Sequence, residues 1–276
     1  MTTREFVTNV SIILVVMAIG AALEILVPMF ADKPWKRRRR AANLRLTALS
    51  FASNWLLSSS AALAALSLRP AGLLAQRGLP FWAEVLIGIV VLDFSVGYLS
   101  HRTMHMWSPM WRFHRVHHSD PFVDVTTTYR AHPVETVWRF LFAIVPIWVL
   151  GLPAEALLIQ RMLQATNGVI EHANIRLWAP LDRVLSTFWV TPNVHKIHHS
   201  RQVNETNSNY ANLLTVYDRV LGTYTPSERA ADVQYGLDDA AELGRAPFTG
   251  LVVMPFQRTH SDRRAQSVSG QASLGR

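Results

Sequence analysis

An apolar run meets two histidine motifs in residues 81–119, FWAEVLIGIVVLDFSVGYLSHRTMHMWSPMWRFHRVHHS. The apolar part, Phe81 to Ser100, has about the 20 residues that a helix needs to cross a bilayer. The first motif, HRTMH at 101–105, begins where this run ends, and the second, HRVHH, follows at 114–118. The stretch therefore predicts a membrane helix that carries histidines to one surface of the membrane.

The composition narrows the classes of protein that the chain can form. Half of its 276 residues are apolar, which is too many for a disordered chain and high for a soluble enzyme. It has no cysteine, which excludes a disulfide framework, a thiol nucleophile, a cysteine-ligated iron-sulfur cluster and a thiolate zinc finger. Any bound metal would therefore have nitrogen or oxygen ligands.

Four further apolar segments predict helices in the membrane. The first, residues 5–30, is longer than the apolar region of a secretory signal and precedes a basic segment, so we expect a retained helix, with Glu24 facing other helices. The second is 44–68. The last two, 137–150 and 153–170, are parted by Gly-Leu-Pro, a turn signal that predicts a helical hairpin. The expected fold is all-α, a polytopic membrane bundle with a histidine-rich cap that holds two metal ions.

The net charge of +8 has a dense local source, since Lys33, Lys36 and Arg37 to Arg40 place six cations in eight positions. Alone, this run would suggest a nucleic-acid partner. Beside a membrane helix it is typical of a cytoplasmic anchor on anionic headgroups, so we expect no nucleic acid. With this run in the cytoplasm, the order of spans places every histidine motif on the cytoplasmic side of a multi-pass membrane protein.

We expect three regions along the chain. Residues 1–100 would form N-terminal transmembrane helices, and residues 101–235 a histidine-rich domain that includes the membrane hairpin at about 137–170. Residues 236–276 would be a C-terminal extension whose polar tail, with His260, is disordered.

Ten of the eleven histidines lie between residues 101 and 199, in one HxxxH and two HxxHH motifs. Positions i, i+3 and i+4 share a helix face, so we expect each motif to point two or three imidazoles at a common point. Eight or nine imidazoles are too many for one ion and suit two ions with four or five ligands each. Imidazole binds zinc, copper, iron and nickel, and without an HExxH motif a metalloprotease would lack its general base. Redox-active irons beside a bilayer point to oxygen activation on an apolar substrate.

At these motifs the sequence resembles the fatty acid hydroxylase and sterol desaturase superfamily of membrane non-haem di-iron enzymes. The resemblance covers most of residues 101–224. It includes HRTMH, HRVHHS, TYRAHPVE at 128–135, EHAN at 171–174, TPNVHKIHHS at 191–200 and NYANLLTVYDRVLGTY at 209–224. It implies a helical membrane bundle with a cytosolic domain that holds two irons. These irons would use O2 and electrons from a separate donor to hydroxylate or desaturate a C–H bond of a lipid.

The resemblance also implies a ligand set, with no catalytic residue beyond the metal ligands. His172 stands where members have an additional ligand, and Arg176 stands where some members have a further histidine, so the second iron would carry water there or take His132. Further candidates, as ligands or as hydrogen-bond partners of ligands, are His132, Glu135, Asn193, Asp120, Asp124 and, least favoured because it faces away from its neighbour His172, Glu171. The eight motif histidines are His101, His105, His114, His117, His118, His195, His198 and His199.

The sequence contains no GxGxxG and no haem-peptide signature, so we expect a separate electron donor of the ferredoxin, rubredoxin or cytochrome type. Arg112, Arg115 and Lys196 are candidates for docking an acidic donor, or for facing lipid headgroups. An alternative function is non-catalytic metal binding or transport, which would need a path of ligands inside the spans. Sterol, sphingolipid, fatty alcohol, alkylglycerol and carotenoid substrates all fit the same ligand set.

Overall fold

The computed structural model describes residues 3–31, 36–68, 72–237 and 246–257. Lys33, the side chain of Lys36 and the tail with His260 lie outside the described residues. Within those ranges the chain is helical and has only isolated β-bridges, which confirms the all-α prediction. The longer helices are α1 (Thr3–Leu26), α2 (Lys36–Leu68), α3 (Phe81–Leu92), α6 (Pro133–Leu150) and α7 (Ala154–His172). The shorter ones are α4 (Ser100–Met106), α5 (Ser108–His118), α8 (Ala179–Leu185), α9 (Pro192–His198), α10 (Val203–Thr206), α11 (Val216–Val220) and α12 (Phe248–Val253).

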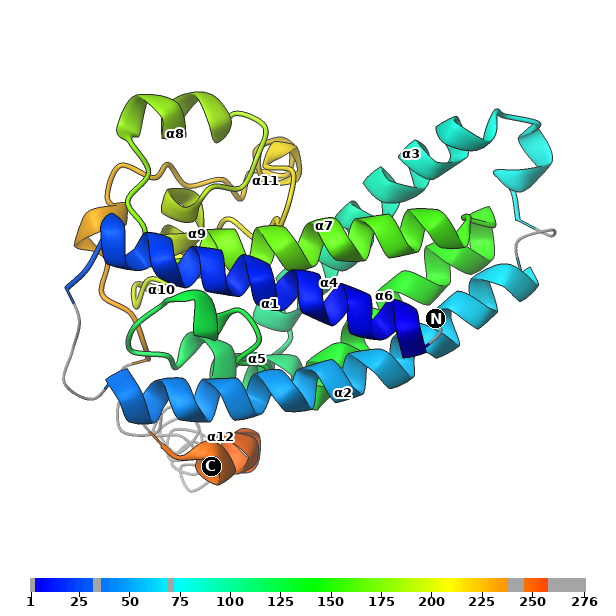
Figure 1. Cartoon of the computed structure of the whole chain (residues 1–276). Helices are drawn as coiled ribbons and strands as arrows, with labels where there is room; N and C mark the ends of the chain where they lie inside the picture. The colour runs from blue at the N-terminus through cyan, green and yellow to red at the C-terminus, as the bar shows by residue number, and fades with distance from the viewer. Residues whose placement is uncertain (1–2, 32–35, 69–71, 238–245, 258–276) are drawn as a thin grey trace, which may run out of the picture.

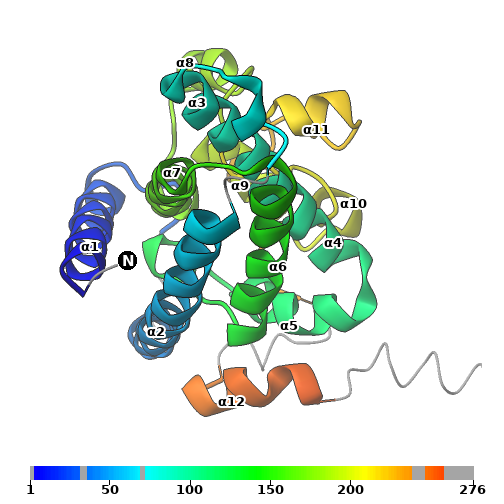
Figure 2. The same cartoon turned by 90° about the vertical axis from the view of Figure 1, so that its right-hand side faces the viewer.

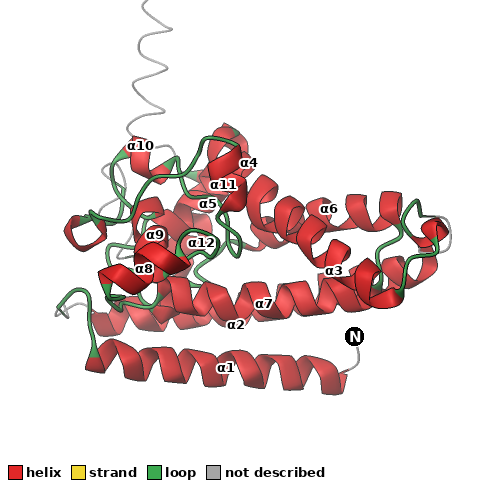
Figure 3. Ribbon diagram, turned by 90° about the horizontal axis from the view of Figure 1, so that it is seen from above, coloured by secondary structure: helices red, strands yellow, loops and turns green. Residues whose placement is uncertain are grey.

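The long helices form an elongated bundle, and the short ones gather at one end of it (Figure 1). α2 packs against α6, and α7 packs against both α1 and α3. Figure 2 shows α1 at the edge of the bundle, and Figure 3 shows it running alongside α2 and α7. At the opposite end, the α2–α3 connection meets the end of α6, where the amides of Leu73 and Leu74 donate to the carbonyls of Val149 and Leu150.

Three helical segments are long and apolar enough to cross a membrane: Arg4–Leu26, Phe81–Met106 and Pro133–Leu150. Their outer faces carry exposed apolar side chains, including Ile25, which is 81% exposed, and Trp82, which is 67% exposed. Such a surface suits lipid rather than water. Five segments were predicted to enter the membrane, and neither α2 nor α7 is among the three found in the described residues. In α7 the reason is its polar content, which includes charged and amide side chains throughout its length.

The predicted hairpin is confirmed, because α6 ends at Leu150 and α7 begins at Ala154. Between them Gly151 has φ +68°, a left-handed conformation that favours glycine and ends helices. The two helices therefore turn back at this point, and the chain returns toward the end of the bundle where the histidines lie (Figure 1).

A seven-residue π-helical segment, Asp93–Leu99, joins α3 to α4 and the first histidine motif. Its Ser95 hydroxyl donates to the carbonyl of Phe142 at 2.7 Å. Pro146 in α6 has no N–H to bond that carbonyl, so Ser95 replaces the lost helical hydrogen bond. This contact fixes the segment before His101 against α6.

Part of the basic run turns inward instead of facing lipid headgroups. Arg39 is buried and donates to Asp120 at 2.8 Å and also to Asp124. Arg40 donates to Asp124 at 3.0 Å and to Glu24 at 3.3 Å. The prediction of a headgroup anchor is therefore wrong for these two arginines, because buried carboxylates attract them more strongly than the surface does. Glu24 faces inward, as predicted.

The C-terminal segment after residue 246 closes the side of α2. Leu251 and Met254 are fully buried in a cluster with Leu46 and Val116. The Arg115 guanidinium donates to the carbonyl of Met254 at 2.7 Å, so α5 holds this segment in place.

We expect Arg39→Met to lower the free energy of unfolding by about 3–5 kcal/mol, because it takes the arginine away from buried Asp120 and leaves Asp124 with Arg40 alone. The matched control is Arg38→Met, since Arg38 is the exposed neighbour on the same helix. Thermal unfolding of the detergent-purified protein would measure both. Equal midpoints for the two variants would contradict this account of the basic run.

Candidate metal centre

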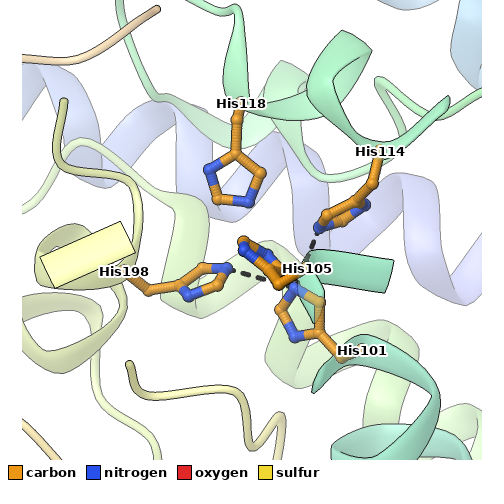
Figure 4. Close-up of side chains that lie close together, drawn as sticks. All are labelled: His101, His105, His114, His118 and His198. Carbon is orange, nitrogen blue, oxygen red and sulfur yellow. Dashed lines mark hydrogen bonds between the residues drawn. The ribbon is translucent and has the colours of Figure 1, made fainter. Parts of the chain in front are cut away.

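Nine histidines converge in two adjacent groups at the capped end of the bundle, and they are the nine that the sequence predicted as ligands. In each group the potential ligand nitrogens lie within 4.8 Å of one another. The five-histidine cluster, shown in Figure 4, consists of His101, His105, His114, His118 and His198. The four-histidine cluster consists of His117, His172, His195 and His199.

Each HxxHH motif divides its histidines between the two clusters. From α5, His114 and His118 enter the five-histidine cluster, while His117 enters the other. The second motif, at α9, contributes only His198 to the five-histidine cluster. Each motif therefore brings two imidazoles to a common point, as predicted, and the third histidine of each HxxHH motif enters the other cluster. At about 100° per residue, positions i and i+4 diverge by about 40°, whereas i+3 and i+4 diverge by about 100°.

In the five-histidine cluster, backbone carbonyls fix the tautomers of two rings. His101 Nδ1 donates to the carbonyl of Tyr210 at 2.7 Å, and His198 Nδ1 donates to that of Ser208 at 2.7 Å. A carbonyl can only accept, so in each neutral ring the proton is on Nδ1 and Nε2 carries a lone pair. The two Nε2 atoms are 3.1 Å apart. Two lone pairs at this distance repel each other unless a cation lies between them.

The four-histidine cluster repeats this arrangement. His172 Nδ1 donates to the carbonyl of Gly168 at 2.6 Å, and the His117 ring hydrogen-bonds the backbone of Arg130. Their Nε2 atoms are 3.1 Å apart. Both clusters therefore aim lone pairs from opposing rings at a shared point.

The nitrogen spacing fits a metal ion. The Nε2 atoms of His172, His195 and His199 are 3.0, 3.1 and 3.2 Å apart. An ion about 2.1 Å from each nitrogen, with angles near 90–110°, would separate them by about 3.0–3.4 Å. Burial lowers the pKa of His198 to about 4 and that of His117 to about 3, so protons do not supply the positive charge near pH 7. An all-imidazole donor set suits iron, zinc, copper or nickel.

Glu135 supports one of these rings, since its Oε2 accepts from His114 Nδ1 at 2.7 Å. Such a carboxylate fixes the orientation of a ligand and raises its basicity. His132, weighed as a tenth ligand, lies in neither cluster. It begins α6, where its Nδ1 accepts from the amide of Val134 at 3.3 Å, and its ring packs against Phe113.

The other predicted supports hold loops rather than imidazoles. Asn193 exchanges two hydrogen bonds with the backbone of Leu177, at 3.1 and 3.3 Å. Asp120 and Asp124 accept from Arg39 and join the cap to α2. Their prediction as partners of ligands is therefore wrong, because an arginine and backbone groups already use these side chains.

Glu171, the least favoured candidate, is close to the four-histidine cluster. Its Oε1 lies 3.8 Å from His195 Nε2 and accepts from Asn212 Nδ2 at 2.7 Å. Asn167, one helical turn earlier on the same face of α7, donates to the other oxygen at 3.2 Å. Burial raises the pKa of the Glu171 carboxyl. We ranked Glu171 last because it points away from His172, but α9, which carries His195, packs on the face of α7 where Glu171 lies. The sequence did contain a signal for this position, because Asn167 stands four residues before Glu171 and therefore shares its helix face.

The loop that supplies the two carbonyls is itself held in place. Asn209, between Ser208 and Tyr210, has φ +52°, and its Nδ2 donates to the carbonyl of Val194 at 3.2 Å. The Asp218 carboxylate accepts from the amide of Tyr210 at 2.9 Å. These contacts orient the flanking carbonyls toward His101 and His198. They could not be predicted from the sequence, because backbone acceptors have no residue signature.

Two of the cations predicted to dock an electron donor are internal. Lys196 is fully buried, and its ammonium donates to the carbonyl of His172 at 2.6 Å, at the end of α7. Burial lowers its pKa to about 7. Arg115 is buried against the C-terminal segment. The prediction is therefore wrong for both, and only Arg112 is partly exposed.

Residues 85–223, which contain both clusters, match the family model described as fatty acid hydroxylase. The chain belongs to the fatty acid hydroxylase family. Ornithine lipid hydroxylase OlsE of Rhizobium tropici is 31% identical over 65% of this chain and 52% of its own length. The alkylglycerol monooxygenases of Xenopus tropicalis and Homo sapiens are 28% and 29% identical over 56% of this chain and 32% and 33% of their own lengths. The matches thus span about half or less of these relatives. No solved structure matches the chain.

We expect the protein to bind two equivalents of metal, one for each cluster. His198→Ala and His195→Ala should each lower the content toward one equivalent or less, because each removes a ligand from a different cluster. Metal analysis after anaerobic loading with ferrous iron would measure this. The control is His132→Ala, which should keep both ions. Fewer than two equivalents in the unsubstituted protein, or equal losses in all three variants, would contradict a dinuclear site.

We also expect metal-free protein to lose stability on acidification. His198 and His117 have pKa values near 4 and 3 in the folded chain and near 6.5 when unfolded, so between these values the unfolded chain binds more protons. The free energy of unfolding should therefore fall as pH drops from about 6.5 toward 4, by on the order of 1 kcal/mol per pH unit for each histidine. Chemical unfolding in detergent at pH 7.5 and 5 would measure this. His198→Gln should reduce the slope, and a stability that does not change with pH would refute the argument.

Proposed function

We propose that this chain is a membrane-bound, O2-dependent di-iron oxygenase that hydroxylates or desaturates a lipid. The observation that carries the proposal is one cavity of about 250 Å³ that touches both histidine clusters. His101 and His114 line it from the five-histidine cluster, and His117, His172 and His195 from the other. A substrate in this cavity would lie beside both metal positions.

The histidines suit two irons because they supply nitrogen ligands in groups of five and four. Bound there, irons would supply the activation of O2 with electrons from a donor. The protein holds three of the candidate ligands, His198, His101 and His172, in one tautomer through the carbonyls of Ser208, Tyr210 and Gly168. Apolar side chains of α1 and α2, including Ile13 and Phe51, line the same cavity and would exclude water from a bound lipid.

Two observations bear on the reaction and the substrate. The relatives are named for hydroxylation of ornithine lipid and monooxygenation of alkylglycerol, which favours hydroxylation over desaturation for this chain. The three segments suited to a membrane each contribute lining residues to the cavity, which favours a substrate taken from the bilayer. We therefore propose a membrane lipid that carries a polar head.

The histidine-rich end would face the cytoplasm and receive electrons from a separate ferredoxin, rubredoxin or cytochrome. Arg37 and Arg38 remain exposed at that end of α2, in agreement with positive-inside bias. Trp111 lies between the surface and the five-histidine cluster, with its ring 5.0 Å from that of His105 and 5.5 Å from that of His118. Trp111 and His105 are both partly exposed, so we propose that electrons enter on this side of the cap.

The test is lipid analysis of host cells with and without the chain, grown under ¹⁸O2. We expect an oxidised lipid that carries the label, and its amount should fall at least about tenfold in His117→Ala, which removes a ligand. Arg183→Gln, an exposed change on α8, serves as the control. A lipid product that persists in His117→Ala, or no lipid change in any strain, would refute the oxygenase. If two ions are nevertheless bound, that result would support metal storage or transport instead.

A further inference from the structure

Two arginines line the cavity that reaches the histidines: Arg139 of α6 and Arg161 of α7. Each lies on one of the two helices of the hairpin, and α6 itself is long and apolar enough to cross a membrane. A guanidinium at this depth costs free energy and is retained where it faces a polar space or performs a function. Both arginines face the same cavity rather than lipid.

The helix register places the two arginines at similar depth. Arg139 stands 12 residues before Gly151, and Arg161 stands 8 residues after Pro153. At 1.5 Å per residue these positions are about 18 and 12 Å from the turn, a difference of about 6 Å. One oxyanion group between them would be within reach of both long side chains. α6 packs against α2, and α7 packs against α3. Residues of α2, α6 and α7 line the cavity.

The two acidic residues of the cavity, Glu135 and Glu171, act on Arg139 through their charge, and each also accepts a hydrogen bond from another group. Glu135 accepts from His114 at 2.7 Å, and Glu171 accepts from Asn212 at 2.7 Å. Arg139 makes one hydrogen bond among the described residues, to the carbonyl of Val96 at 3.2 Å, so its planar group keeps donors for a ligand.

The cavity wall near the arginines is also polar, since Asn54 and Gln164 line it. A polar head could hydrogen-bond these amides, whereas an alkyl chain could not. Because burying a polar group against an alkyl chain costs free energy, this part of the cavity suits a head group better than a lipid tail.

We propose that Arg139 and Arg161 bind an anionic group, a carboxylate or a phosphate, in the polar head of the lipid substrate. This inference rests on the proposed function and names the substrate class of that site. It also limits the distance between the anionic group and the carbon that is oxidised. Arg139 is one turn, about 6 Å, from Glu135 beneath the five-histidine cluster, and Arg161 is 11 residues, about 16 Å, from His172. The oxidised carbon therefore lies within about 16 Å of the anion.

The experiment measures binding to the detergent-purified full chain with three probes that share an oleoyl chain: N-oleoylglycine, oleoyl phosphate and neutral N-oleoylethanolamine. We expect an anionic probe to bind at least tenfold more tightly than the neutral one, and the two anions show whether carboxylate or phosphate is preferred. Arg139→Gln and Arg161→Gln should each weaken anion binding about tenfold to a hundredfold and leave neutral binding unchanged. Arg139→Lys should restore part of the loss, and Arg183→Gln should have no effect.

Binding of the neutral probe and retention of both metal ions show that the variants keep their fold. Equal affinity for neutral and anionic probes, or anion binding unchanged in both glutamine variants, would overturn the inference. Because binding needs no turnover, its failure is separate from that of the proposed function. If the chain binds the anions through these arginines but oxidises no lipid, the anion site is supported and the proposed oxygenase function is refuted.

Discussion

Lone pairs of buried imidazole nitrogens that face each other repel, and this repulsion is the constraint on which the rest of the structure depends. His101 and His198 meet in this way at 3.1 Å, and backbone carbonyls hold their other nitrogens so that neither ring can turn aside. Burial lowers the pKa of His198 to about 4, so protonation of this ring does not relieve the repulsion near pH 7. The arrangement therefore suits a metal ion at the point where α4, α5, α9 and the end of α7 meet.

Because of helix geometry, the histidines form two clusters instead of one. Neighbouring residues on a helix diverge by about 100°, so His117 and His118 point to different clusters. In its cluster each meets histidines of the second HxxHH motif: His195 and His199 for His117, and His198 for His118. Two ions bound by these clusters would therefore lie close together. The buried contacts of Arg39 with Asp120 and Asp124 then join this cap to α2, so the sites are fixed relative to the cavity beneath them.

The eight motif histidines and the hairpin could be predicted because spacing and residue type carry that information directly, whereas His172 was predicted from the family resemblance alone. The spacing of the histidines from His195 to His199 is enough to indicate a ligand motif, and Gly151 with Pro153 marks a turn. Partners were harder to predict. Arg39, Arg115 and Lys196 were expected at the surface, since a cation in a sequence does not reveal the carboxylate or carbonyl that folding brings to it. Carbonyl acceptors such as that of Tyr210 have no signature at all, so the groups that set the tautomers emerge only from the fold.

Metal binding and the choice of substrate depend on different side chains. In the proposed function the histidines would hold the ions through nitrogen atoms that point at one another, so they would contribute little to discrimination between lipids. Discrimination must come from the remainder of the cavity wall, where Ile13 and Phe51 offer apolar contacts and Arg139 and Arg161 offer charge. Apolar contacts tolerate many chains, because a methylene more or less changes binding by only about 1–3 kcal/mol. A guanidinium that faces the cavity would be more selective, since a lipid that cannot neutralise it would bear the cost of desolvating it. Under this proposal the choice of lipid would depend on the two arginines more than on the apolar wall.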